Sequence, residues 1–142
     1  MDFIERDCKM PDAPPPHNLA FIVCDGIIED RETGKKTLVG IFNRVNSGTF
    51  PCRLDALSVF VSLTAGHGRY QAQLQCVKST EDKPIFQIEG PVEFESPNAV
   101  VELGFNIRGL AFPEPGPYEF RFLCGELFST RPFEVLQIGG QR

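Results

Sequence analysis

The sequence contains no tryptophan, only two histidines, and no apolar run of the roughly 18–20 residues that a membrane span requires. With only His17 and His67, the side chains available for acid–base catalysis are few. Its fourteen Lys and Arg residues are scattered, and the longest basic run is Lys35-Lys36. Nucleic-acid binding needs clustered cations. We therefore expect neither a nucleic-acid partner nor membrane insertion.

The five cysteines are an odd number and include no Cys-x-x-Cys pair. Secreted disulfide frameworks usually have an even count. The first residues, MDFIERDCKM, lack the basic and apolar regions of a signal peptide. We expect a reducing, cytoplasmic location, with a leaderless export route as the alternative.

The chain has 142 residues, of which 42% are hydrophobic and thirteen are Phe. This is the size of one ordinary domain. Each well-buried Phe contributes roughly 1.5–3 kcal/mol, so a stable core is within reach without disulfides or metals. The net charge of −5 favours solubility and indicates little else.

From Asn18 onward, short apolar runs alternate with Gly, Pro and Asn turn signals, and no window shows a helical apolar stripe. In LDALSVFVSLTA, for example, one face carries Leu57, Val59, Val61 and Leu63. We predict an all-β, single-domain antiparallel β-sandwich of seven to nine strands, immunoglobulin-like with Greek-key connections. The predicted organisation is a proline-rich N-terminal arm (1–17), the sandwich (18–138) and a C-terminal tail (139–142).

The stretch FIVCDGIIEDRETGKKTLVGIF, within residues 19–45, predicts a hairpin that is apolar on both faces. Cys24 and Asp25 point to opposite faces of a strand, so they cannot form one catalytic pair. We expect Cys24 to be a buried core residue. We expect Asp25 to lie at a bulge made by Gly26, bonded to turn amides or paired with Lys35 or Arg44.

No catalytic motif, zinc-ligand spacing or calcium loop is present. Cys76 and Cys124 fall in phase with core positions, which favours burial. We therefore expect a non-enzymatic protein with no catalytic residue, no metal and no cofactor. A calcium site assembled from carboxylates distant in sequence is the remaining alternative.

In FPEPGPYEFRF, a Pro115-Gly116 turn precedes Tyr118, which opens a strand. This order is similar to the start of a strand in many immunoglobulin-like sandwiches, where a tyrosine hydroxyl bonds to nearby backbone. We expect an architectural role for Tyr118.

Four features together resemble a family of small bacterial proteins that carry a domain of unknown function: Cys24-Asp25 at a strand end, the TGK turn at 33–35, the Gly-Ile-Phe strand at 40–42, and the FPxPGxYxF segment at 112–120. The resemblance covers about residues 19–136 and omits the arm. It implies a β-sandwich fold and supplies no site to carry over.

Two hypotheses for function remain. The first is a non-catalytic protein-binding or assembly module, with a protein partner or self-association through an edge strand, the arm or the hairpin. Its interface residues are Phe3, Ile4, Ile22 and Phe42. The alternative is a small-ligand or carbohydrate-binding sandwich, or a small hydrolase. Its site uses the charged residues Asp25, Lys35, Arg44 and Arg108.

Overall fold

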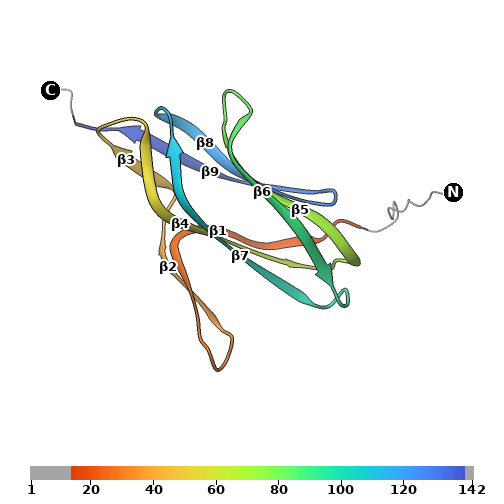
Figure 1. Cartoon of the computed structure of the whole chain (residues 1–142). Coiled ribbons are helices and arrows are strands. Elements are labelled where there is room, and N and C mark those ends of the chain that lie inside the picture. Colours follow the sequence, from red (N-terminus) through yellow and green to blue (C-terminus); the bar gives the residue numbers. More distant parts are fainter. Residues whose placement is uncertain (1–13, 140–142) are drawn as a thin grey trace.

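The computed structural model describes residues 14–139, which form nine β-strands and no helix (Figure 1). The strands are β1 (His17–Glu29), β2 (Lys36–Ile41), β3 (Arg44–Ser47), β4 (Cys52–Thr64), β5 (Gly68–Lys78), β6 (Lys83–Phe94), β7 (Val100–Phe112), β8 (Gly116–Cys124) and β9 (Leu127–Gln137). Among these residues there is accordingly no helix long and apolar enough to cross a membrane. The arm residues Phe3 and Ile4 lie outside the described range.

The strands form two open sheets that pack face to face (Figure 1). One sheet has the order β2-β1-β4-β7 and the other the order β3-β9-β8-β5-β6. Every pairing is antiparallel except that of β3 with β9. The predicted all-β, single-domain sandwich is confirmed, while its immunoglobulin-like topology stays a prediction.

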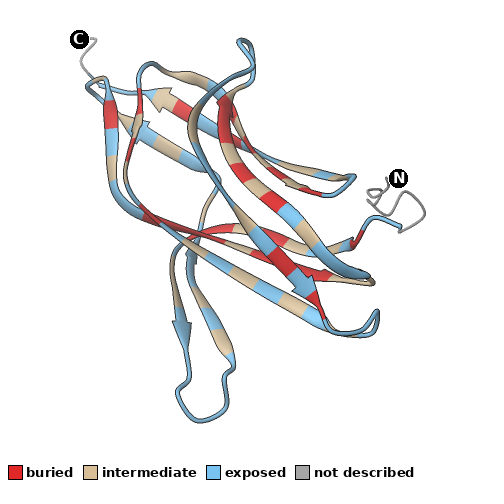
Figure 2. Cartoon of the chain, turned by 45° about the vertical axis from the view of Figure 1, so that its right-hand side comes forward, coloured by how far each residue is buried: buried red, intermediate tan, exposed pale blue. Residues whose placement is uncertain are grey.

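The core follows from alternation along the strands, which sends every second side chain between the sheets (Figure 2). The ring of Phe133 is buried in this core. It contacts Phe42, Phe112 and Phe120, at centroid distances of 5.6, 5.5 and 5.4 Å. These rings come from both sheets and from the segment between β2 and β3. Aromatic packing therefore joins three parts of the chain that are distant in sequence.

Tyr118 is buried, and its hydroxyl donates a 2.7 Å hydrogen bond to the carbonyl oxygen of Glu114. Its ring packs edge-on against Phe112. The bond closes the turn before β8 and gives the buried phenol a partner, which a buried hydroxyl requires. The architectural role expected for Tyr118 is confirmed.

The predicted hairpin within residues 19–45 ends earlier than expected, because its second strand stops at residue 41. Residues 36–41 form β2 in the first sheet, whereas residues 44–47 form β3, which pairs parallel with β9 in the second. Phe42, between them, turns its ring into the core against Phe133. The free energy gained by burying this ring offsets the backbone hydrogen bonds that one continuous strand would have formed.

Two core thiols predict a fall in stability at high pH. Cys76 and Cys124 are fully buried, as expected, and burial raises their pKa values to about 12 and about 11. An unfolded thiol titrates near 8.5. Between that pH and the folded pKa values, the unfolded chain has released protons that the folded chain keeps, so the free energy of unfolding decreases as pH rises.

We expect urea unfolding between pH 8 and 10.5 to show this decrease. In Cys76→Ala/Cys124→Ala the decrease should be smaller, by up to about 1.4 kcal/mol per pH unit for each thiol removed. The double variant is less stable at pH 7 because it loses buried atoms, so the comparison uses the slopes. Equal slopes in the two proteins would contradict the prediction.

Candidate functional site

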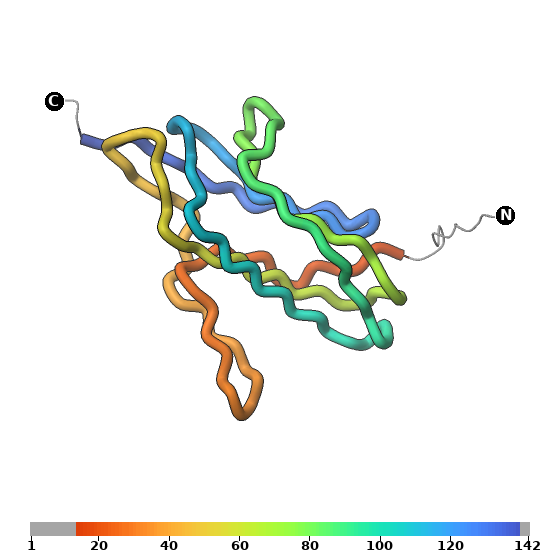
Figure 3. The backbone as a smooth tube through the Cα atoms, in the orientation of Figure 1, coloured from red at the N-terminus to blue at the C-terminus, as the bar shows by residue number. Residues whose placement is uncertain are grey.

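The β1–β2 hairpin leaves the body of the sandwich halfway along β1 (Figure 1, Figure 3). From His17 to Cys24, β1 pairs with β4. From Cys24 to Glu29 it pairs with β2, and its pairing with β4 ends at Cys24. Residues 25–40 therefore form a two-stranded ribbon that projects from the outer side of the four-stranded sheet.

The backbone irregularity at the base of this hairpin lies at Gly40. Its φ of +68° falls in the left-handed region, where a side chain is strained. A Cβ built there would lie 2.3 Å from Oδ2 of Asp25, which faces it across the ladder. A side chain at residue 40 would therefore require the Asp25 carboxylate to move.

The roles predicted for Gly26 and Asp25 need correction. The register runs without a shift from Cys24 opposite Ile41 to Glu29 opposite Lys36, so the bulge expected at Gly26 is absent from this ladder. Asp25 is exposed and forms no ion pair with any residue in the range 14–139. Its carboxylate stays in water on the hairpin's surface, and needs no buried partner.

The turn of the hairpin is held by Asp30. Its Oδ2 accepts a 3.0 Å hydrogen bond from the Thr33 amide and a second from the Thr33 hydroxyl, which lowers the pKa of the Asp30 carboxyl. Its backbone carbonyl accepts from the amide of Gly34, whose φ is +74°. An aspartate that bonds amides two or three residues on is a common turn device.

One side of the hairpin faces the outer surface of the four-stranded sheet. Lys36 Nζ lies 2.9 Å from Oε1 of Glu102 on β7, and this bond raises the pKa of Lys36. Near it, Ile27 lies against Gly104, where a built Cβ would meet Cδ1 of Ile27 at 3.2 Å. An ion pair and an apolar contact thus connect the hairpin to β7.

Cys24 is buried at the outer surface of the four-stranded sheet. It is fully buried but lies outside the core between the sheets, so the prediction of burial is confirmed and the assignment to that core is wrong. In the ladder Cys24 is opposite Ser58, which is also buried and bonds to Asn106. Burial is the largest cause of the raised pKa of the Cys24 thiol, which leaves it protonated and a poor nucleophile.

The other side of the hairpin exposes large aliphatic side chains. Ile28, Val39 and Ile41 are 58%, 43% and 66% exposed. Val39 and Ile41 are two residues apart on β2, and Ile28 lies diagonally across on β1, so all three share one face. We call these three residues the hairpin patch.

A groove of about 270 Å³ adjoins the hairpin patch through Ile41. The lining residues are Phe21, Ile22, Val23, Ile41, Phe42, Asn43, Arg131 and Pro132. Its one ionic side chain, Arg131, donates from Nε to the Phe21 carbonyl at 2.6 Å and lies over the Phe21 ring. Six of the eight lining residues have apolar side chains.

The groove brings together Ile22 and Phe42, two of the four predicted interface residues. Both are half-buried, and Phe42 is bound to the core through Phe133. The exposed members of the surface, Ile28, Val39 and Ile41, were not singled out from the sequence. The sequence shows apolar residues on both faces of the hairpin. This pattern indicates the hairpin as a binding element, but it does not indicate which of its two faces is exposed to solvent.

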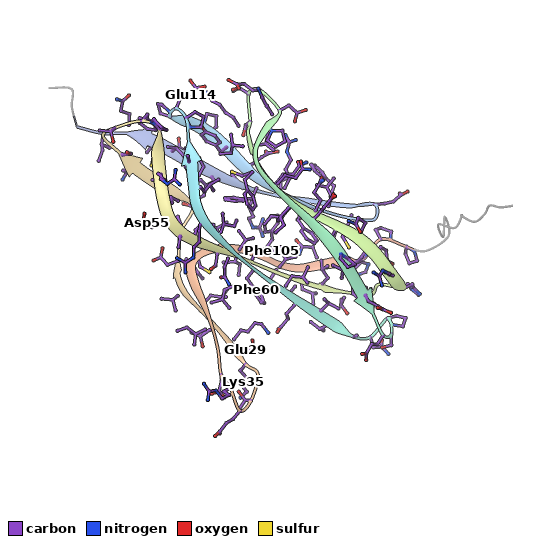
Figure 4. The ribbon with its side chains drawn as sticks, in the orientation of Figure 1. Glu29, Lys35, Asp55, Phe60, Phe105 and Glu114 are labelled. Atoms are coloured by element: carbon purple, nitrogen blue, oxygen red, sulfur yellow. The ribbon has the colours of Figure 1, made fainter. Side chains whose placement is uncertain are left out.

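The four charges of the ligand-binding hypothesis lie on different elements. Asp25 is on β1 and Lys35 is at the hairpin tip (Figure 4), whereas Arg44 begins β3 in the other sheet. Arg108 lies on β7, beyond β4 from the hairpin strand β1. None of these residues lines the groove. The groove therefore does not join these residues, and the ligand-binding hypothesis stays a prediction.

A known family model matches most of the chain. The model of a family of unknown function, DUF6941, matches residues 19–136, which include all nine strands apart from the first and last residues. No curated protein matches the chain.

No group of three or more His, Cys, Asp or Glu residues within 14–139 is placed to hold a metal ion.

The contact between Asp25 and Gly40 predicts a measurable coupling. Gly40→Ala should lower the free energy of unfolding by at least about 1 kcal/mol, from left-handed strain plus the clash with the carboxylate. Asp25→Ala alone should be near neutral because the side chain is exposed. In the double variant the clash is gone while the strain remains, so its loss should be smaller than the sum of the single losses.

Urea unfolding of the four proteins measures this coupling. Gly90→Ala is the matched control, since Gly90 lies in a strand, has no positive φ and has no atom within 4 Å of a built Cβ. Additive effects of the two substitutions would show that the carboxylate does not constrain residue 40.

Proposed function

We propose that this chain, which belongs to DUF6941, a family of unknown function, is a non-catalytic protein-binding module. Its binding surface is the hairpin patch together with the adjoining groove. The partner is a protein that covers this surface with apolar side chains.

The exposure of the hairpin patch is the observation that carries the proposal. Isolated exposed aliphatic residues are common on protein surfaces, but neighbouring ones beside an apolar groove are typical of interaction sites. Val39 and Ile41 adjoin each other on one face, and Ile41 continues into the groove. Removal of this continuous surface from water would provide the driving force for binding.

The hairpin is also held in place before any partner arrives. The Asp30 turn fixes its tip, and Lys36 and Ile27 connect it to β7. Isolated two-stranded hairpins are only marginally stable in water. These contacts therefore reduce the conformational entropy that binding would otherwise cost, which favours affinity.

Ile41→Asp tests the proposal, with Ile88→Asp as the matched control. Ile88 is an exposed aliphatic on a strand, 46% exposed, and lies on β6 in the other sheet. Each tagged protein is purified from the cells that naturally express it, and partners at stoichiometric amounts are identified by mass spectrometry. The affinity of each partner is then measured with purified proteins by calorimetry.

We expect a partner that binds the wild type and Ile88→Asp alike, and binds Ile41→Asp at least about thirtyfold more weakly. That factor corresponds to about 2 kcal/mol, the loss typical of a residue at the centre of an interface. Circular dichroism confirms that both variants are folded. Equal affinity for the two variants, or the absence of any stoichiometric partner, would overturn the proposal.

A further inference from the structure

Strand β7 is an uncovered edge of the four-stranded sheet. Among residues 14–139 its only ladder partner is β4, and the pairing is continuous from Val100 opposite Thr64 to Arg108 opposite Ala56. Nine residues of regular strand, roughly 30 Å, therefore present one free row of backbone donors and acceptors. Such an edge is a template for another strand.

Strand β6, an edge of the five-stranded sheet, lies next to β7 and differs from it in its proline content. It contains Pro84 and Pro91, each within its ladder with β5. Proline has no amide hydrogen and interrupts pairing at an edge. Strand β7 has no proline between Val100 and Phe112. Of these two neighbouring edges, only β7 has the regular backbone that strand addition requires.

The inward side chains of β7 are incompletely covered. Leu103 and Phe105 are half-buried, whereas their ladder neighbours on β4, Val61 and Val59, are fully buried. The difference arises because β4 has a strand on each side and β7 has one. Figure 4 shows Phe105 on the side of the other sheet, where its ring contacts Phe122. A strand added to β7 would cover the exposed flank of these side chains.

Charge on the outward face of β7 is arranged symmetrically about Phe105. Glu102 lies three residues before it and Arg108 three residues after it. Both are exposed, and Arg108 forms no ion pair with any residue from 14 to 139. Glu102 binds Lys36 through one carboxylate oxygen, which leaves the other available.

We propose that two copies of this chain pair through β7, antiparallel, about a two-fold axis at Phe105. Glu102 of each copy then lies opposite Arg108 of the other, and Leu103 lies opposite Ile107. The two four-stranded sheets become one continuous eight-stranded sheet. An isologous contact of this kind uses the same patch on both copies, as most homodimers do.

The charges select this register among the alternatives. Pairing centred on Gly104 or Asn106 places Glu102 and Arg108 opposite uncharged residues. A parallel, in-register pairing places like charges side by side, which is unfavourable. Only the arrangement centred on Phe105 forms two opposite-charge pairs at once.

The pairing uses a surface separate from the hairpin patch and so goes beyond the proposed function. The two-fold axis of an antiparallel strand pair is perpendicular to the sheet, so both hairpins would project from the same side of the dimer. If the proposed function holds, the dimer is bivalent. A partner with two sites would then bind with increased avidity.

Charge reversal tests the dimer in the full chain. Arg108→Glu and Glu102→Arg each place like charges opposite one another twice, whereas the double variant Glu102→Arg/Arg108→Glu restores two opposite-charge pairs. Because Glu102→Arg also removes the ion pair with Lys36, circular dichroism confirms that each variant is folded. Sedimentation velocity from 1 to 200 µM gives the dissociation constant of each protein. Ile41→Asp serves as the control, because it changes the hairpin patch without changing β7.

We expect a wild-type dimer, at least about a hundredfold weakening in Arg108→Glu, and recovery to within about tenfold of wild type in the double variant. Ile41→Asp should stay dimeric. A wild-type monomer at 200 µM, a dimer that Arg108→Glu leaves intact, or a double variant as monomeric as the single ones would each overturn the proposal. A dimer lost only in Ile41→Asp would place the contact at the hairpin instead.

Partner binding distinguishes the two proposals. If Arg108→Glu is monomeric and still binds the hairpin partner, the proposed function stands alongside the β7 dimer. A β7 dimer whose hairpin has no partner would leave this inference intact and overturn the proposed function.

Discussion

The contact between the rings of Phe42 and Phe133 determines where the chain passes from one sheet to the other. Because Phe42 turns into the core, the ladder of β2 ends at Ile41 and the chain enters the second sheet as β3. The hairpin before it is then free to leave the sheet plane. Both the groove and the uncovered aliphatic face beside it follow from this one inserted ring.

Much of the fold follows from local pattern. Alternation in β4 and β5 assigns the buried face correctly because a strand with a period of two has only two faces to choose between. The turn at Gly34 and the anchoring of Tyr118 are also local, since each bonds within a few residues. The division of residues 36–47 between two sheets depends on Phe133, about ninety positions later, and no nearby residue indicates it.

The sequence predicted that the hairpin could form the candidate site, but it did not predict which hairpin residues are exposed there. An apolar hairpin was visible, but the face that stays exposed depends on the bend at Asp25 and Gly40, which is a cross-strand effect. Cys24 illustrates the same limit. Its apolar context indicates burial, and only the position of the hairpin over the outer surface explains why it is buried outside the main core.

The parallel pairing of β3 with β9 has a consequence for how the molecule folds. Strand β9 lies inside the second sheet, between β3 and β8, although it comes after the other eight described strands in the sequence. Contacts across such a sequence separation close slowly, because the loop entropy is lost before the contact forms. Until residues 127–137 emerge, β3 has no partner and Phe42 has no Phe133 to pack against. During synthesis, the ring of Phe42 therefore stays without its core contact until the final strand of the second sheet is available.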